Sequence, residues 1–197
     1  FLIRYADDYV ACFEREADAR AFLIEMRERM AKFDLEIEPS KTALLQFGSA
    51  MLTPRGLGRP RVQCQGPRTF SFLGFTHYVG RSRTGRFVVG RKTDSKRLGK
   101  KLNALNARLR ALRTEGGNAM VAFLARHLQG HIQYYGVSGN SRGLSSYVYF
   151  AQRLLFKWLN RRSQKRSMNW KQFSTYILRM LPKARILHNL YPVPWWM

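Results

Sequence analysis

The sequence predicts an α+β fold, in which an antiparallel sheet with one covering helix precedes an all-α region of three to four helices. Apolar runs within residues 1–13 and 70–91 are rich in aromatic and β-branched residues and are broken by turn residues, as is typical of strands. From Asp94 onward leucines recur at spacings of three and four, as is typical of amphipathic helices. These patterns predict two domains, residues 1–92 and residues 93–197.

Residues 1–13 predict a β-hairpin with Ala6, Asp7 and Asp8 at its bend. Two neighbouring acids on a regular strand face opposite sides, whereas at a bend both can face the same side. Such a pair repels itself unless a cation lies between the carboxylates, and Mg²⁺ prefers oxygen ligands of this kind. The bend is therefore a candidate magnesium site. The alternative is a polar turn without a metal, since Asp is a common turn residue.

The next segment predicts a helix, two strands and a linker. Residues 17–33 place Phe22, Met26, Met30 and Phe33 on one side of a helix that lies over the sheet. Residues 35–38 alternate as an edge strand does, and residues 41–47 can be the next strand. Residues 48–69 are rich in Gly, Pro and Arg and predict a linker, whose glycines lack the strand-to-helix frame of a dinucleotide-binding motif.

Residues 70–79 predict a further aromatic strand that pairs with residues 86–91 across a polar turn. Gly74 inside this strand costs stability, and the usual reason for such a glycine is a bulge or the close approach of another backbone. A nucleic-acid backbone and ordinary sheet packing both satisfy that reason.

The second half predicts a small helical bundle. One apolar seam runs through Leu98, Leu102, Leu105, Leu109 and Leu112, and further helices are expected from Asn118, from near Ser141 and from Asn169. Gln172 lies three residues after Asn169 and predicts a capping box, and Pro182 ends that helix. His127 and His131 have a spacing that could bind zinc, but with no third ligand nearby we expect no metal there.

The charge distribution predicts a polyanionic partner. Residues 1–38 hold ten of the twelve acids, whereas residues 39–197 hold two acids and twenty-nine of the thirty-five basic residues. So basic a region needs a polyanion to relieve its self-repulsion, and nucleic acid is the usual one. Ribosomal-type structural proteins and proteins that bind anionic membranes share this balance.

No apolar run reaches the roughly 18 residues that a membrane span needs, and no secretory signal is visible. We therefore expect a soluble, cytoplasmic protein. Cys12 and Cys64 make neither a disulfide framework nor a zinc site. The chain opens on Phe1 within a predicted strand, which suggests a piece of a longer protein.

Several strings of the sequence resemble one protein family. Tyr5-Ala6-Asp7-Asp8, preceded by Phe-Leu-Ile-Arg, resembles the metal-binding YADD motif of reverse transcriptases that bacterial group II introns encode. Phe72-Leu73-Gly74-Phe75 is similar to the hairpin that grips the primer strand in these polymerases. The string from Gly130 to Asn140 and the tail from Arg185 to Pro192 resemble parts of the thumb, or maturase, domain of the same family.

The resemblance implies that residues 1–92 are the C-terminal part of the palm and residues 93–197 the α-helical thumb. The family's fingers and the front half of its palm, with another metal-binding aspartate, have no counterpart in the chain. The intact protein would be an RNA-directed DNA polymerase with a maturase role in RNA splicing, and this chain alone would not polymerise. Two Mg²⁺ ions about 3.5–4 Å apart would support nucleotidyl transfer.

The resemblance also implies roles for individual residues. Asp7 would be the principal metal ligand and Asp8 the adjacent, more replaceable one. Tyr5, Ala6 and Lys41 would lie near the incoming nucleotide, although Lys41 also fits a surface lysine at a strand start. Phe72, Leu73, Gly74 and Phe75 would grip the primer.

The expected partners are intron RNA, an RNA template with its DNA primer, and deoxynucleoside triphosphates. The basic residues expected to contact nucleic acid are Arg91, Lys92, Lys96, Arg97, Lys100, Lys101, Arg108, Lys157, Arg161, Arg162, Lys165 and Arg166. Charge runs are usually solvated faces, but the acids that normally intersperse them are absent here. Two alternatives remain: a non-catalytic RNA-binding splicing factor, in which the acidic pair is unused, and a basic structural protein.

Overall fold

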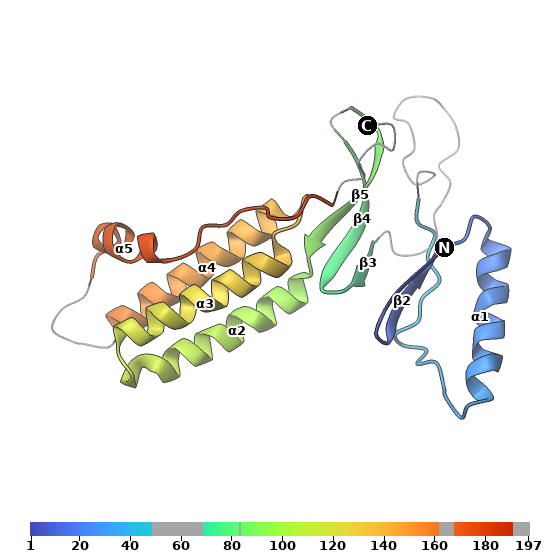
Figure 1. Ribbon diagram of the computed structural model, residues 1–197, viewed down its shortest axis with the longest axis horizontal. Helices are drawn as coiled ribbons and strands as arrows, with labels where there is room; N and C mark the ends of the chain where they lie inside the picture. Colours follow the sequence, from blue (N-terminus) through green and yellow to red (C-terminus); the bar gives the residue numbers. More distant parts are fainter. Residues whose placement is uncertain (49–68, 83, 162–167, 191–197) are drawn as a thin grey trace. The chain divides into compact units, whose positions relative to one another are not determined.

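The computed structural model of the protein describes residues 1–48, 69–82, 84–161 and 168–190 (Figure 1). Its described residues form an α+β fold with two small antiparallel sheets, one of two strands and one of three, and five α-helices. The predicted fold class is confirmed. The predicted linker, including Cys64, lies almost entirely outside the described residues.

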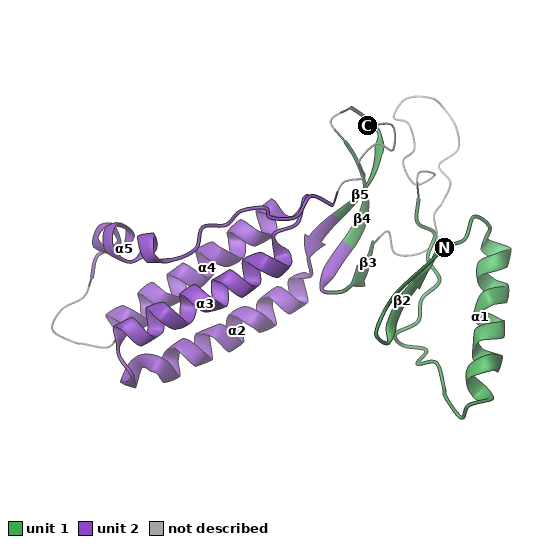
Figure 2. Ribbon diagram, viewed as in Figure 1, with its two compact units in different colours: residues 1–73, 77–90 green, residues 74–76, 91–197 purple. Residues whose placement is uncertain are grey.

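The chain divides into two compact units, which Figure 2 colours separately. Unit 1 comprises residues 1–73 and 77–90, and unit 2 comprises residues 74–76 and 91–197. The chain thus passes into unit 2 after Gly90, close to the predicted boundary at residue 92. Residues 74–76 join unit 2 because Gly74 lies against Tyr135 of the helical region.

Unit 1 begins with the predicted hairpin. Strand β1 (Leu2–Tyr5) pairs antiparallel with β2 (Asp8–Ala11), and the register joins Tyr5 to Asp8. Helix α1 (Glu16–Ala31) follows and matches the predicted helix closely, but Ala19 is its one buried residue. Within the described chain, α1 therefore covers little of any sheet.

The prediction of strands at residues 35–38 and 41–47 is wrong, because the structure has no strand at these residues. The backbone bonds locally instead: the amide of Lys41 donates to the carbonyl of Glu38 at 3.2 Å, and that of Thr42 to Pro39 at 3.4 Å. A strand needs a neighbour for its N–H and C=O groups, and among the described residues β1 and β2 pair only with each other.

The single strand predicted at residues 70–79 is two strands. Strand β3 (Thr69–Phe72) turns at Leu73 and Gly74 into β4 (Phe75–Arg81), which pairs with β5 (Phe87–Thr93). Leu73 and Gly74 have φ values of 49° and 79°. Positive φ at both central residues is the pattern of a type I′ hairpin turn. Gly74 is therefore a turn residue rather than a glycine inside a strand.

The described part of unit 2 contains four α-helices, which confirms the predicted helical region. They are α2 (Ser95–Ala111), α3 (Gly117–Tyr135), α4 (Ser141–Asn160) and α5 (Trp170–Tyr176), with short 3₁₀ turns at Leu112–Thr114 and Leu178–Met180. Helix α3 begins one residue before Asn118, where its start was expected, so Asn118 is not the cap. The cap is Gly116, whose φ of 108° suits the sharp entry to the helix.

The core of unit 2 lies between α2, α3 and α4. The predicted leucine seam supplies Leu105, Leu109 and Leu112 to it, each at most 3 % exposed. Phe173 of α5 joins this core, and the predicted capping box is present: the amide of Gln172 donates to Asn169 Oδ1 at 2.8 Å. Unit 2 thus buries a continuous apolar core, whereas among the described residues of unit 1 only Ala19 is buried.

The segment after α5 returns along the end of α3. The amides of Leu187 and His188 donate to the carbonyl of Gly136 at 2.6 and 3.0 Å, and the amide of Ser138 donates to the carbonyl of His188 at 2.9 Å. These bonds hold residues 185–190 against the α3–α4 junction. Among the described helices, none has the length and apolar character that crossing a bilayer requires.

Candidate functional site

The predicted acidic pair lies at the turn of the β1–β2 hairpin. Ala6 and Asp7 form a two-residue loop, and Asp8 is already the first residue of β2. Ala6 has a φ of 51°, a left-handed conformation that Ala rarely adopts, and Arg4 Nε donates to its carbonyl at 2.9 Å. Because positive φ is the requirement of tight hairpin loops, the turn itself sets this backbone geometry.

Asp7 and Asp8 have side chains of the chemical type that binds hard divalent cations. Both residues are exposed, and within the described ranges no basic side chain forms a salt bridge with either. Carboxylate oxygens are the ligands that Mg²⁺ prefers. However, no group of three His, Cys, Asp or Glu side chains occurs among the residues that the structure describes, so the pair is a partial ligand set.

Two of the residues expected near the nucleotide are also exposed. Tyr5 is 65 % exposed at the end of β1, directly opposite Asp8 in the register. Lys41 is exposed in the turn that it forms with residues 39–40, not at the start of a strand. A hydrogen bond from the Ser40 hydroxyl to Glu38 Oε1 at 2.7 Å lowers the pKa of that neighbouring carboxyl.

The predicted primer grip is the turn between β3 and β4. Phe72 and Leu73 are half-buried within unit 1, whereas Gly74 and Phe75 belong to unit 2. Gly74 is buried, its carbonyl accepts from the amide of Asp94 at 3.0 Å, and a Cβ here would lie 2.8 Å from the hydroxyl oxygen of Tyr135. The Asp94 backbone and the Tyr135 side chain therefore both lie close to Gly74.

The string from Gly130 to Asn140 has a structural role in the fold. Asn140 is 1 % exposed, and its amide bonds to the backbone and hydroxyl of Thr93 and to the carbonyl of Tyr135. Phe75 stacks on Tyr134 with ring centroids 5.9 Å apart. Together these contacts join the end of β5 and the start of β4 to the α3–α4 junction.

A polar cluster inside the bundle includes His127 and His131, whose spacing could bind zinc. His131 is 1 % exposed, stacks on Tyr147 at 3.7 Å and receives a hydrogen bond at Nδ1 from Lys101 Nζ at 3.1 Å. Burial, then the charge of Lys101, lowers the pKa of His131 to about 3. Burial also lowers the pKa values of Lys101 and His127, and it raises that of Tyr147.

The residues expected to contact nucleic acid divide into three groups. Exposed residues are Lys92, Lys96, Arg97, Lys100, Arg108, Lys157 and Arg161. Two are partly buried: Arg91 donates to the carbonyl of Leu190 at 3.2 Å, and Lys101 is engaged with His131. Arg162, Lys165 and Arg166 lie outside the described residues.

Trp158 belongs to the core of unit 2, and basic side chains gather around it. Arg113, Lys157 and Arg161 all lie over its ring, with charged groups 5.0–5.6 Å from the centroid. Lys157 and Arg161 are four residues apart, so the sequence predicts that they lie on one helix face. Arg113 follows α2, and only the tertiary structure shows that it approaches the same ring.

Comparison with known protein families, with curated proteins and with solved structures finds no match to this chain.

Proposed function

We propose that this chain is part of an RNA-directed DNA polymerase with an intron maturase role, in which Asp7 and Asp8 bind Mg²⁺. The observation that carries the proposal is the acidic pair at the turn of the β1–β2 hairpin, exposed and without a salt bridge to any described basic residue. A bound polyanion suits the remainder of the chain, in which basic residues far outnumber acids.

In this proposal Asp7 is the principal metal ligand and Asp8 the adjacent one. When bound, Mg²⁺ supplies Lewis acidity for displacement at the α-phosphate of a nucleotide. The described residues bring no third acid to the pair, so polymerisation requires a further ligand. The proposed partners, in the cytoplasm, are intron RNA, a template–primer duplex and deoxynucleoside triphosphates.

The test is magnesium-dependent primer extension on an RNA template with the intact protein. We expect Asp7→Asn to abolish nucleotide incorporation while RNA binding stays nearly unchanged, because the substitution removes a metal ligand and keeps the turn. Asp18→Asn is the matched control, since Asp18 is an exposed acid in the first turn of α1. Retained synthesis by Asp7→Asn would remove the catalytic role of the hairpin.

A non-catalytic RNA-binding splicing factor is the second candidate. It is supported by unit 2 alone, where Arg113, Lys157 and Arg161 converge on one tryptophan. RNA binding with steep salt dependence is expected of both candidates. Incorporation of nucleotides by the intact protein distinguishes them, because only the polymerase requires Asp7.

A further inference from the structure

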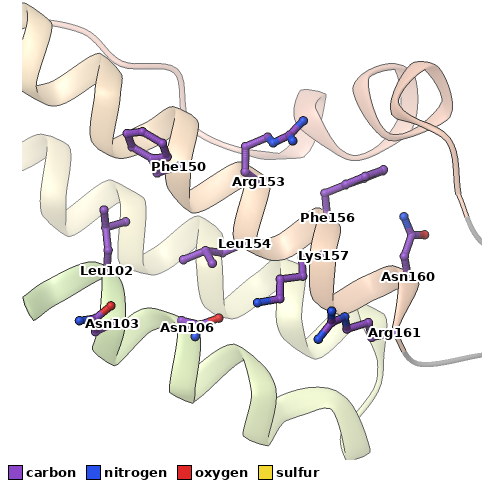
Figure 3. Close-up of a pocket in the computed structure, with 10 residues that line it drawn as sticks. All are labelled: Leu102, Asn103, Asn106, Phe150, Arg153, Leu154, Phe156, Lys157, Asn160 and Arg161. Carbon is purple, nitrogen blue, oxygen red and sulfur yellow. The ribbon is translucent and has the colours of Figure 1, made fainter. Parts of the chain in front are cut away.

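A groove with a volume of about 640 Å³ lies between α2 and α4 of unit 2 (Figure 3). Leu154 and Lys157 extend into it from α4, and Leu102, Asn103 and Asn106 face it from α2. A second hollow of about 610 Å³ shares Asn106 and Lys157 with it and is also lined by Arg110, Arg113 and Trp158. The two hollows adjoin and form one surface, which we name the α2–α4 groove.

The lining of the α2–α4 groove is strongly basic. Five of its residues are cations, namely Arg110, Arg113, Arg153, Lys157 and Arg161, and none of its lining residues is an acid. Like charges held close together raise the free energy of the unliganded protein, and a bound anion relieves that cost. The groove therefore suits an anionic ligand.

Three of these cations converge on a fixed point. The charged groups of Arg113, Lys157 and Arg161 lie 5.2, 5.0 and 5.6 Å from the ring centroid of Trp158. Trp158 is 6 % exposed, and its Nε1 donates to Asn106 Oδ1 at 2.8 Å, so its ring is held in place. Cation–π attraction gathers the three charges where a phosphate could bridge them.

An exposed aromatic ring lies in the same groove. Phe150 is 50 % exposed and lines the groove. It is followed along α4 by Arg153, Lys157 and Arg161 at spacings of three, four and four, which place all four residues on one helix face. Aromatic rings interleaved with cations are the arrangement that binds single strands, because bases stack on the rings while phosphates meet the charges.

We propose that the α2–α4 groove binds an unpaired RNA strand, with phosphates at Arg113, Lys157 and Arg161 and a base stacked on Phe150. Unpaired bases present their faces for stacking, whereas an A-form duplex hides them and offers mainly phosphates and 2′-hydroxyls. The inference rests on the RNA-binding part of the function proposed above and specifies which form of RNA is preferred.

The experiment measures affinity of the full chain for a fluorescent oligouridine and for an RNA duplex of the same length. Phe150→Ala is expected to weaken oligouridine binding by about 5- to 150-fold, the range of base–aromatic stacking, and to leave duplex binding unchanged. Lys157→Gln is expected to reduce the slope of log affinity against log salt by about 0.7 on the single strand. Circular dichroism checks that each variant is folded.

Matched controls are Tyr176→Ala and Lys171→Gln, which remove an exposed aromatic ring and an exposed charge from α5, outside the groove. If the chain binds oligouridine and both groove variants behave as their controls do, the α2–α4 groove is not the site, and the proposed RNA-binding function stands. Equal losses on strand and duplex would also overturn the inference, as would preferential binding of phosphatidylserine vesicles that Phe150→Ala weakens. Failure of the parent chain to bind either RNA would overturn both proposals.

Discussion

Asn140 bonds twice to the side chain of Thr93, across 47 residues of sequence. Asn140 Oδ1 accepts from the amide and hydroxyl of Thr93 at 2.8 and 3.1 Å, and its Nδ2 donates to Thr93 Oγ1 and to the carbonyl of Tyr135, both at 2.9 Å. Both residues are at most 9 % exposed. One amide thus satisfies polar groups at the end of β5 and at the end of α3.

Asn140→Ala should lower the free energy of unfolding by about 2–4 kcal/mol. The substitution leaves the buried amide and hydroxyl of Thr93 without these partners, and each such group costs about 1–3 kcal/mol. Urea unfolding followed by circular dichroism measures the change. Asn118→Ala is the control, because Asn118 is exposed in the first turn of α3 and should cost little. A similar loss in both variants would show that the buried amide bonds contribute nothing specific.

Gly74→Ala should destabilise the protein more than Gly85→Ala does. Both glycines have positive φ, 79° and 77°, so both substitutions pay the same backbone strain of about 1 kcal/mol. An added Cβ at Gly74 lies 2.8 Å from the Tyr135 hydroxyl oxygen, whereas at Gly85 no atom lies within 4 Å. The difference between the unfolding free energies of the two variants, measured by heat or urea, therefore gives the cost of crowding between the new Cβ and the Tyr135 hydroxyl.

The double variant Gly74→Ala with Tyr135→Phe separates strain from crowding. Removing the hydroxyl oxygen takes away the atom nearest to the new methyl group while keeping the ring of Tyr135 in the core. We expect the double variant to be more stable than the sum of the single effects predicts. Strict additivity would mean that backbone conformation alone explains the need for glycine.

Stability should fall as the pH is lowered from about 6.5 toward 3. The folded protein holds the pKa of His131 at about 3 because the ring is buried and faces the charge of Lys101, whereas the unfolded chain binds a proton near 6.5. Between these values the unfolded state holds more protons, so acid favours unfolding by up to about 1.4 kcal/mol per pH unit. His127, whose pKa burial also lowers, acts in the same direction.

His131→Phe should flatten this acid dependence. Phe can keep the stacking on Tyr135 and Tyr147, at 4.6 and 3.7 Å in the parent, without a titrating group. Urea unfolding at a series of pH values gives the slope, and His188→Gln, at a partly buried position on the returning tail, is the control. An unchanged slope in His131→Phe would show that other groups cause the acid sensitivity.

The sequence was sufficient to predict those features whose structure is determined by residues that are neighbours along the chain. The capping box at Asn169 and Gln172, the leucine seam of α2 and the hairpin around Asp7 depend on contacts within a few residues, and each is present. The turn at Leu73 was missed because Leu is uncommon at positive φ and gives no turn signal. The strands predicted at residues 35–38 and 41–47 are absent because neither segment has a pairing partner among the described strands.

The α2–α4 groove could not be predicted from the residue pattern of the sequence alone. Asn106 and Arg113 come from α2 and the turn after it, while Lys157, Trp158 and Arg161 lie at the far end of α4, so only packing of α2 on α4 brings them together. Sequence reasoning named Lys157 and Arg161 as contacts but had no means to find their common centre at Trp158.

Ala6→Gly should leave the stability of the hairpin almost unchanged and so tests whether Ala6 has a role beyond the turn. The φ of 51° at Ala6 costs about 1 kcal/mol, which Gly would relieve. Gly also loses about 0.5–1 kcal/mol through the greater freedom of the unfolded chain, so the two effects nearly cancel. Amide hydrogen exchange of the β1 and β2 backbone measures the result, with parent protein as reference.

If exchange is unchanged while primer extension by the intact protein falls, the methyl group of Ala6 contacts the nucleotide. If exchange instead becomes faster, the methyl group stabilises the hairpin, and the expected cancellation is wrong.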